Sequence, residues 1–147
     1  LKSGTNPDVV SIIDSFADYV RCMGIAVEIS VIGQDQYKLL KSKASFMPIS
    51  DTLYKVCREA VTNSLRHGKA TKITIIMKFS INSVKMFIID DGLGCIEVKK
   101  GIGLTGMETR VKEIGGFISY GSHDGNGFNI NIEIPLEIGE NDESISC

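Results

Sequence analysis

Apolar residues recur along this chain in two rhythms, one typical of helices and one typical of strands. Near the N-terminus they repeat at helical spacing and stop at Gly24, which predicts a helix capped by Asn6 with Pro7 at its first position. The apolar stripe of this helix consists of Val9, Ile12, Ile13, Phe16, Val20 and Met23. Residues 25–32 then alternate between apolar and polar side chains, as expected for a strand, and a turn follows at Gly33.

The rest of the chain repeats these rhythms, apart from one unclear stretch. Residues 36–46 fit neither rhythm well, and we expect a second strand and a loop there. A long helix is predicted from near Ser50, a good N-cap residue. Its buried stripe is predicted to consist of Leu53, Val56, Cys57, Ala60, Val61, Ser64 and Leu65. Later segments are predicted as strands at 71–80, 83–90, 117–120 and 128–134 and as a helix at 105–114, ended by Gly115 and Gly116.

This alternation of helical and strand-like segments predicts an α/β class. At 147 residues, of which 43% are hydrophobic, the chain suits one domain with a proper core. We expect a mixed sheet of about five strands with helices on one face. The domain is predicted to span residues 1–136, and the acidic segment 137–147 is predicted to be a disordered tail.

Composition and charge argue against several classes of function. The formal net charge is −2 and the basic residues are scattered, so we expect no nucleic-acid surface. No apolar run approaches the length of a membrane span, so we expect no membrane contact by this domain. The four cysteines have neither paired nor metal-type spacing, which favours reduced thiols in the cytoplasm over a zinc site.

Polar side chains share one edge of the long predicted helix. Glu59, Asn63 and His67 follow one another at intervals of one turn, and Arg66 lies beside them. Polar groups at a buried margin are costly unless a partner needs them there. The amide oxygen of Asn63 suits Mg²⁺, and Glu59 could polarise a nucleophile or order a metal-bound water. Taken alone, however, the stripe fits better an amphipathic helix with solvated polar residues.

An apolar strand ends on two carboxylates, Asp90 and Asp91, which are followed by Gly92 and Gly94. A carboxylate is seldom buried without a partner. If it is fixed, it can accept a hydrogen bond from the exocyclic amine of adenine, a donor that guanine lacks at that place. The glycines allow a turn and let a base lie against the backbone. On its own, a common Asp-Gly turn between strands is the simpler interpretation.

A third segment, residues 101–107, reads Gly-Ile-Gly-Leu-Thr-Gly-Met and leads into a predicted helix. The backbone N–H groups of such a glycine-rich loop can surround phosphate oxygens. The N-terminus of the following helix points to the same place and favours an anion there. The spacing matches neither a P-loop nor a dinucleotide fingerprint.

Together and in this order, the three segments resemble the ATP-binding catalytic domain of sensor histidine kinases, in the superfamily that includes gyrase, Hsp90, MutL and anti-sigma-factor serine kinases. The likeness is greatest to the kinases that partner NarL-type response regulators, the nitrate-sensor and DesK-like group. Their first motif, Glu-Ala-Val/Leu-Thr-Asn-x-x-Arg/Lys-His, stands here at residues 59–67, and the resemblance is specific over 51–135. It implies a two-layer α/β sandwich of the Bergerat type, with the nucleotide between the sheet, the long helix and a lid.

The resemblance also implies roles for individual residues, with ATP and Mg²⁺ as cofactors. Glu59 is expected to be the catalytic residue, Asn63 the Mg²⁺ ligand and Asp90 the adenine contact. The expected ATP-binding residues are Asn63, Arg66, His67, Asp90, Gly92, Gly94, Gly101, Gly103, Leu104, Gly106 and Met107. His67 also fits a purely structural role. One departure lies after Gly127, where the family usually has Thr and this chain has Phe128.

The implied partners are a histidine phosphoacceptor and dimerisation domain and, indirectly, a response regulator of the NarL type. Because the chain starts at Leu1 and resembles only part of a kinase, we expect a piece of a longer cytoplasmic protein or of the cytoplasmic part of a membrane-bound sensor. Two rival functions stay open. An anti-sigma-factor serine kinase usually continues its first motif with His-Gly-Tyr, whereas Lys69 follows Gly68 here. A nucleotide-sensing module without transfer activity is only mildly disfavoured by Glu59.

Overall fold

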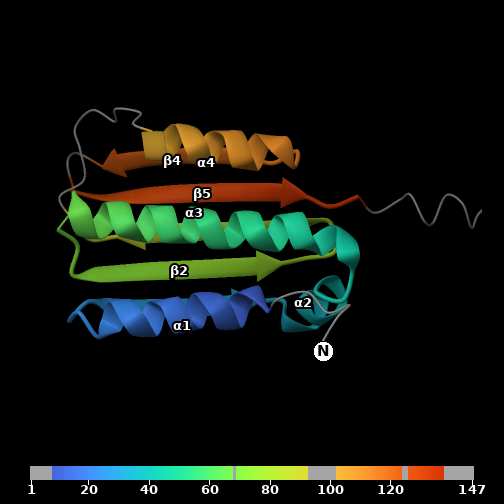
Figure 1. The fold of residues 1–147 in the computed structure, drawn as a ribbon, viewed down its shortest axis with the longest axis horizontal. Helices are drawn as coiled ribbons and strands as arrows, with labels where there is room; N and C mark the ends of the chain where they lie inside the picture. Colours follow the sequence, from blue (N-terminus) through green and yellow to red (C-terminus); the bar gives the residue numbers. More distant parts are fainter. Residues whose placement is uncertain (1–7, 68, 93–101, 124–125, 138–147) are drawn as a thin grey trace, which may run out of the picture.

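The computed structural model describes residues 8–67, 69–92, 102–123 and 126–137. Within these ranges the chain forms a mixed five-stranded sheet with helices packed on one face (Figure 1). The elements are α1 (Val9–Arg21), β1 (Ala26–Ile32), α2 (Gln34–Leu40), the 3₁₀ helix η1 (Ala44–Phe46), α3 (Met47–Arg66), β2 (Lys72–Phe79), β3 (Ser83–Asp90), α4 (Ile102–Glu113), β4 (Phe117–His123) and β5 (Asn126–Pro135). The predicted fold class is confirmed.

The sheet has the strand order β1-β2-β3-β5-β4. β1 and β2 are parallel and are joined by a crossover that contains α2, η1 and α3, while all the other pairs are antiparallel. α1, α3 and α4 lie side by side across one face, with α3 in the middle (Figure 1). The central helix therefore lies over the middle of the sheet and between its two neighbouring helices.

The core lies between this helical layer and the sheet. Alternate residues along most of β2 and β3 are buried, because successive side chains of a strand point to opposite faces of the sheet. The side chains that α3 contributes include Leu53, Val56 and Cys57, all 0% exposed. Burial raises the pKa of the Cys57 thiol to about 12, so this free cysteine is a core residue without nucleophilic character at neutral pH.

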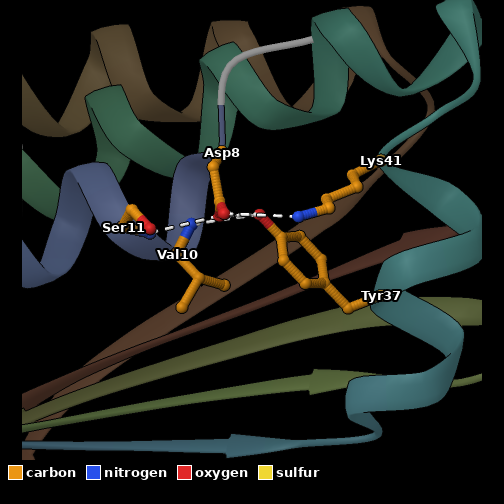
Figure 2. A network of polar contacts seen from close by, with 5 residues as sticks. All are labelled: Asp8, Val10, Ser11, Tyr37 and Lys41. Atoms are coloured by element: carbon orange, nitrogen blue, oxygen red, sulfur yellow. Dashed lines mark hydrogen bonds and ion pairs between the residues drawn. The ribbon is translucent and has the colours of Figure 1, made fainter. Parts of the chain in front are cut away.

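The prediction of a strand at 36–46 is wrong, because α2 and η1 occupy this segment. Tyr37 is the reason: the residue is 3% exposed, and its ring packs against Phe46 and Phe79. Its hydroxyl donates to Asp8 and accepts a hydrogen bond from the N–H of Val10, both at the start of α1 (Figure 2). These contacts come from segments distant in sequence, so local periodicity could not predict them.

Three helix boundaries also differ from the predictions. Asp8, and not Asn6, is the N-cap of α1, since its carboxylate accepts the Ser11 N–H. α3 begins at Met47, and Ser50 lies inside the helix and is buried; Pro48 fits the first turn because proline lacks an N–H donor. α4 begins at 102 instead of 105, so part of the glycine-rich segment is helical. The predicted disordered tail lies outside the described residues, apart from position 137.

In the described part of the chain, no helix combines the length and the apolar character needed to cross a bilayer.

Candidate functional site

The three motif-bearing segments meet at one end of the molecule. The end of α3, the end of β3 and the starts of α4 and β5 all lie at the left in Figure 1. Two close contacts, each centred on one side chain of α3, join them: Ser64 contacts β3 and Glu59 contacts α4. The motif on α3 is thus in contact both with the Asp90 motif at the end of β3 and with the glycine-rich motif at the start of α4.

Asp90 is the buried carboxylate of this site, with 7% of its surface exposed. Its Oδ2 accepts a hydrogen bond from the Ser64 hydroxyl at 2.5 Å, and its Oδ1 accepts one from the Gly92 N–H at 2.8 Å. None of the ion pairs among the described residues includes Asp90. A carboxylate has about four acceptor positions, so Asp90 can still accept a hydrogen bond from a ligand.

The backbone around Asp90 is held by both neighbouring strands. In the sheet register Asp90 lies between Ile73 of β2 and Phe128 of β5. The Gly127 N–H also donates to the Gly92 carbonyl at 2.7 Å. Gly127 has a φ of +73°, and a Cβ there would come within 2.6 Å of the Asp90 carbonyl oxygen. Only glycine suits position 127, where the start of β5 passes close to the backbone of Asp90. This close approach fixes the end of β3.

Glu59 lies against the first turn of α4. A Cβ built at Gly103 would overlap a carboxylate oxygen of Glu59, so a side chain at position 103 would displace one of the two elements. The first N–H groups of a helix have no partner within the helix and favour negative charge. The carboxylate of Glu59 therefore lies where the N-terminus of α4 can stabilise an anion.

Asn63 is half-buried, one turn from Glu59 and adjacent to Ser64. Its side chain makes no hydrogen bond with the described residues, so its amide oxygen is available to a ligand. The described residues include no group of three or more His, Cys, Asp or Glu side chains that could hold a metal ion. A cation bound at Asn63 would take most of its ligands from phosphate and water, which is how Mg²⁺ is usually bound with nucleotides.

Arg66 and His67 lie at the end of α3 and are both exposed. Arg66 lines a shallow pocket on the α1 side of the helix, together with Tyr19 and Met23 of α1, and the structure does not bring it together with Glu59. His67 is the C-cap residue, and its backbone N–H donates to the Asn63 carbonyl at 2.9 Å. The predicted nucleotide contacts of both residues stay predictions.

Among the described residues, α4 supplies three buried side chains to the core, Leu104 at 8%, Met107 at 2% and Val111 at 0% exposure, while the space around Gly106 is open. The helix is anchored to β4 by Glu108, which accepts a hydrogen bond from the Tyr120 hydroxyl at 2.6 Å. This hydrogen bond raises the pKa of Tyr120. The predicted nucleotide contacts of α4 are untested, and Gly94 and Gly101 lie outside the described residues.

Sequence reasoning missed the role of Ser64, which was assigned only to the buried stripe of the helix. The one signal was a small polar residue at an otherwise apolar position. It also missed that Asp91 is a structural residue, which accepts hydrogen bonds from the Thr71 hydroxyl at 2.7 Å and the Lys72 N–H at 2.9 Å. These hydrogen bonds lower the pKa of Asp91, and the bond from the Thr71 hydroxyl has the largest effect.

Phe128 also has a defined place beside the site. It is half-buried, pairs with Asp90 in the sheet, and stacks on Tyr120 with ring centroids 6.4 Å apart. An aromatic ring therefore stands where the resemblance leads one to expect threonine.

Residues 49–138 match the family described as histidine kinase-, DNA gyrase B- and HSP90-like ATPases. The chain belongs to this family. Family membership agrees with the resemblance of the three motifs and implies ATP as the ligand of the site.

Among curated members of the family, the chain is similar to the sensor histidine kinase LnrJ of Bacillus subtilis, with 30% identity over 92% of this chain and 32% of LnrJ. It is also similar to LiaS, another sensor histidine kinase of that organism, with 35% identity over 67% of this chain and 29% of LiaS. The chain thus spans about a third of the length of these relatives. The histidine kinase domain of a blue-light activated kinase from Erythrobacter litoralis shares the fold, with a TM-score of 0.62, 18% identity and coverage of 92% of this chain and 70% of that one.

Proposed function

We propose that this ATPase-family chain is the catalytic domain of a sensor histidine kinase. It would hold Mg-ATP and present the γ-phosphate to a histidine on a separate helical dimerisation domain. The observation that supports this best is the position of α3. Through Ser64 this helix contacts the carboxylate of Asp90, and through Glu59 it contacts the start of α4. Asp90, which could accept a hydrogen bond from the base, therefore lies on one side of the polar stripe of α3. The electropositive N-terminus of α4, which could bind phosphate, lies on the other.

Three groups of residues would bind the nucleotide. Asp90 would accept a hydrogen bond from the exocyclic amine of adenine, since it is buried, charged and lacks a cationic partner among the described residues. The glycines that follow it in the sequence, Gly92 and Gly94, would let the base approach the backbone. Gly101, Gly103 and the N-terminus of α4 would face the phosphates, with Asn63 supplying an oxygen to Mg²⁺.

Glu59 would act on the chemistry of transfer. When bound, ATP would supply the phosphoryl group and Mg²⁺ would neutralise the negative charge of the phosphates. The chain would therefore mainly position the reacting groups. The carboxylate of Glu59 would accept a hydrogen bond from an N–H group of the acceptor imidazole and would thereby orient this ring. Its place beside the first turn of α4 supports this role, because the phosphates would lie in the same region.

The acceptor histidine would be on another domain of the same parent protein. The described residues contain no helical segment that would serve as a dimerising acceptor, and the alignments cover only 32% of LnrJ and 29% of LiaS. A response regulator of the NarL type would receive the phosphoryl group from that domain, in the cytoplasm.

The test is transfer in trans. The chain is mixed with the dimerisation domain of its parent protein and with γ-labelled ATP and Mg²⁺. We expect an acid-labile, base-stable phosphohistidine on the partner. Glu59→Gln should slow the transfer by about 10²- to 10⁴-fold, the usual contribution of a positioned acid or base, with an unchanged affinity for ATP.

The matched control is Glu113→Gln, at the exposed last residue of α4, which should transfer at the wild-type rate. An acid-stable product on serine would favour an anti-sigma-factor kinase instead. Tight ATP binding without transfer to the correct partner would favour a nucleotide-sensing module.

A further inference from the structure

We propose that Ser64 is the positioning residue that fixes the Asp90 carboxylate for a base with an exocyclic amine. It would thereby set the preference of the site for adenine. This inference rests on the proposed function, because it presupposes that Asp90 faces the base.

The Ser64 hydroxyl lies in a buried contact between α3 and β3. Ser64 is 6% exposed and Asp90 is 7% exposed. Ser64 Oγ lies 2.5 Å from Asp90 Oδ2 and 3.1 Å from the carbonyl oxygen of Ala60. A hydroxyl has a single proton, and a charged acceptor binds it more strongly than a neutral carbonyl. The Ser64 hydroxyl therefore donates its proton to Asp90 and not to the Ala60 carbonyl.

This bond determines how the carboxylate is oriented. The last torsion of an aspartate side chain is broad, so the rotamer alone does not fix the plane of the two oxygens. Here one donor holds each oxygen: Gly92 N–H holds Oδ1 at 2.8 Å and Ser64 holds Oδ2. Without the Ser64 hydroxyl, only the Gly92 bond would remain among the described donors, and the plane could rotate about it.

The donor Ser64 and the acceptor Asp90 both lie on regular elements, so their contact can preorganise the site. Ser64 lies on α3, where its neighbours Ala60 and Val61 are 4% and 1% exposed. Asp90 is fixed in the sheet between Ile73 and Phe128. A ligand that meets an already oriented carboxylate does not have to order it on binding, which improves affinity.

The consequence is specific to the exocyclic amine. A base without this amine makes no hydrogen bond to Asp90, so the orientation of the carboxylate should not affect its binding. Purine riboside 5′-diphosphate, which is ADP without the amine, is therefore the decisive probe. A merely structural role of Ser64 would weaken both nucleotides alike.

The experiment measures calorimetrically the affinities of ADP and of purine riboside 5′-diphosphate for the wild-type chain and its variants. The wild type should prefer ADP by about 10- to 100-fold, the effect of one charge-assisted hydrogen bond. Ser64→Ala should bind ADP about 3- to 10-fold more weakly and the analogue equally well. Ser64→Cys has a side chain of similar size but only a weak hydrogen-bond donor, so it should behave like Ser64→Ala. Ser64→Thr, which keeps the hydroxyl, should restore the preference for ADP.

Ser50→Ala is the matched control, because it removes a buried hydroxyl from the other end of the same helix and should leave both affinities unchanged. Circular dichroism checks that each variant is folded. Unchanged ADP binding by Ser64→Ala and Ser64→Cys would overturn this inference alone, and so would equal losses for both nucleotides. A wild type that binds neither nucleotide would overturn the proposed function as well.

Discussion

Two aspartates at opposite ends of the molecule accept a hydroxyl hydrogen bond of the same length but differ in their other partners. Asp8, at the start of α1, accepts the Tyr37 hydroxyl at 2.5 Å, and Asp90, at the end of β3, accepts the Ser64 hydroxyl at 2.5 Å. Asp8 also accepts the Ser11 N–H and forms an ion pair with Lys41 at 3.3 Å (Figure 2).

The difference separates a carboxylate that stabilises the fold from one suited to a ligand. The charge of Asp8 is balanced by Lys41 and by the N-terminus of the helix that it caps. Burial alone would raise the pKa of Asp8, but the hydrogen bonds from Tyr37, Ser11 and Lys41 outweigh it and lower the pKa. Asp90 has no cationic partner among the described residues, and its oxygens have acceptor positions left over for a donor on a ligand.

The largest expected effect comes from the same substitution at both sites. Asp90→Asn should weaken ADP binding by about 1.5–3 kcal/mol, or roughly 10- to 100-fold, because a charge-assisted hydrogen bond is lost. Its free energy of unfolding should change little, because a buried charge is removed and the hydrogen bonds can rearrange. The amide oxygen can accept from the Gly92 N–H while the amide NH₂ donates to Ser64 Oγ, whose own proton can go to the Ala60 carbonyl. Calorimetry measures the affinity, and urea unfolding measures the stability.

Asp8→Asn should give the opposite result, with unchanged affinity and a stability lower by about 0.5–1 kcal/mol. The loss is small because asparagine is also a good N-cap and the Asp8 side chain is 40% exposed, which screens the ion pair. If Asp90→Asn bound ADP like the wild type, Asp90 would not be the base contact and the contrast between the two sites would disappear.

The next effect is on stability alone. Tyr37→Phe should lower the free energy of unfolding by about 1–2 kcal/mol, because the hydroxyl bonded to Asp8 is lost while the ring stays packed against Phe46 and Phe79. ADP affinity should stay within about twofold of the wild type, since this network lies at the end of the molecule opposite the site. A large loss of affinity would show that the two ends are coupled.

The same tyrosine should also make stability depend on pH in the alkaline range. Burial, and next the hydrogen bond to Asp8, raise the pKa of Tyr37 from its ordinary 10.0 to about 12. The folded state therefore holds this proton more tightly than the unfolded state. Its contribution should be complete below pH 10 and lost as the pH rises towards 12.

The measurement is the stability difference between the wild type and Tyr37→Phe, which cannot ionise at this position. This difference should shrink by about 1 kcal/mol between pH 9 and 11, and other titrating groups cancel in the comparison. A difference that is independent of pH would mean that Tyr37 titrates alike in both states.

The smallest effect is expected at Asp91, the neighbour of the ligand-binding aspartate. Asp91→Asn should change stability by less than about 0.5 kcal/mol, because the side chain is exposed and its contacts can be kept. The amide oxygen can accept from the N–H groups of Thr71 and Lys72, and the amide NH₂ can donate to the Thr71 hydroxyl. ADP affinity should not change. A loss as large as that of Asp90→Asn would mean that the two carboxylates act together at the base.

Much of the local structure followed from the sequence alone. The alternation of side chains predicted β1 to within one residue, since burial of one sheet face imposes a period of two. The β-branched and apolar character of the next segments predicted β2 to within one residue at each end and β3 without error. Helical spacing placed Glu59 and Asn63 on one stripe of α3. The order of the three motifs predicted the family, to which the chain belongs.

The tertiary structure decided which groups meet. Ser64 and Asp90 are 26 residues apart, and the contact of Glu59 with Gly103 joins two helices across the site. The segment around Tyr37, where the local pattern was unclear and we expected a strand, is helical. There the Tyr37 hydroxyl binds the start of α1 and the ring packs in the core. A pattern of apolar and polar residues encodes the period of an element and the face that it buries. It does not encode the partner of a polar group, because that contact forms only when distant segments pack together.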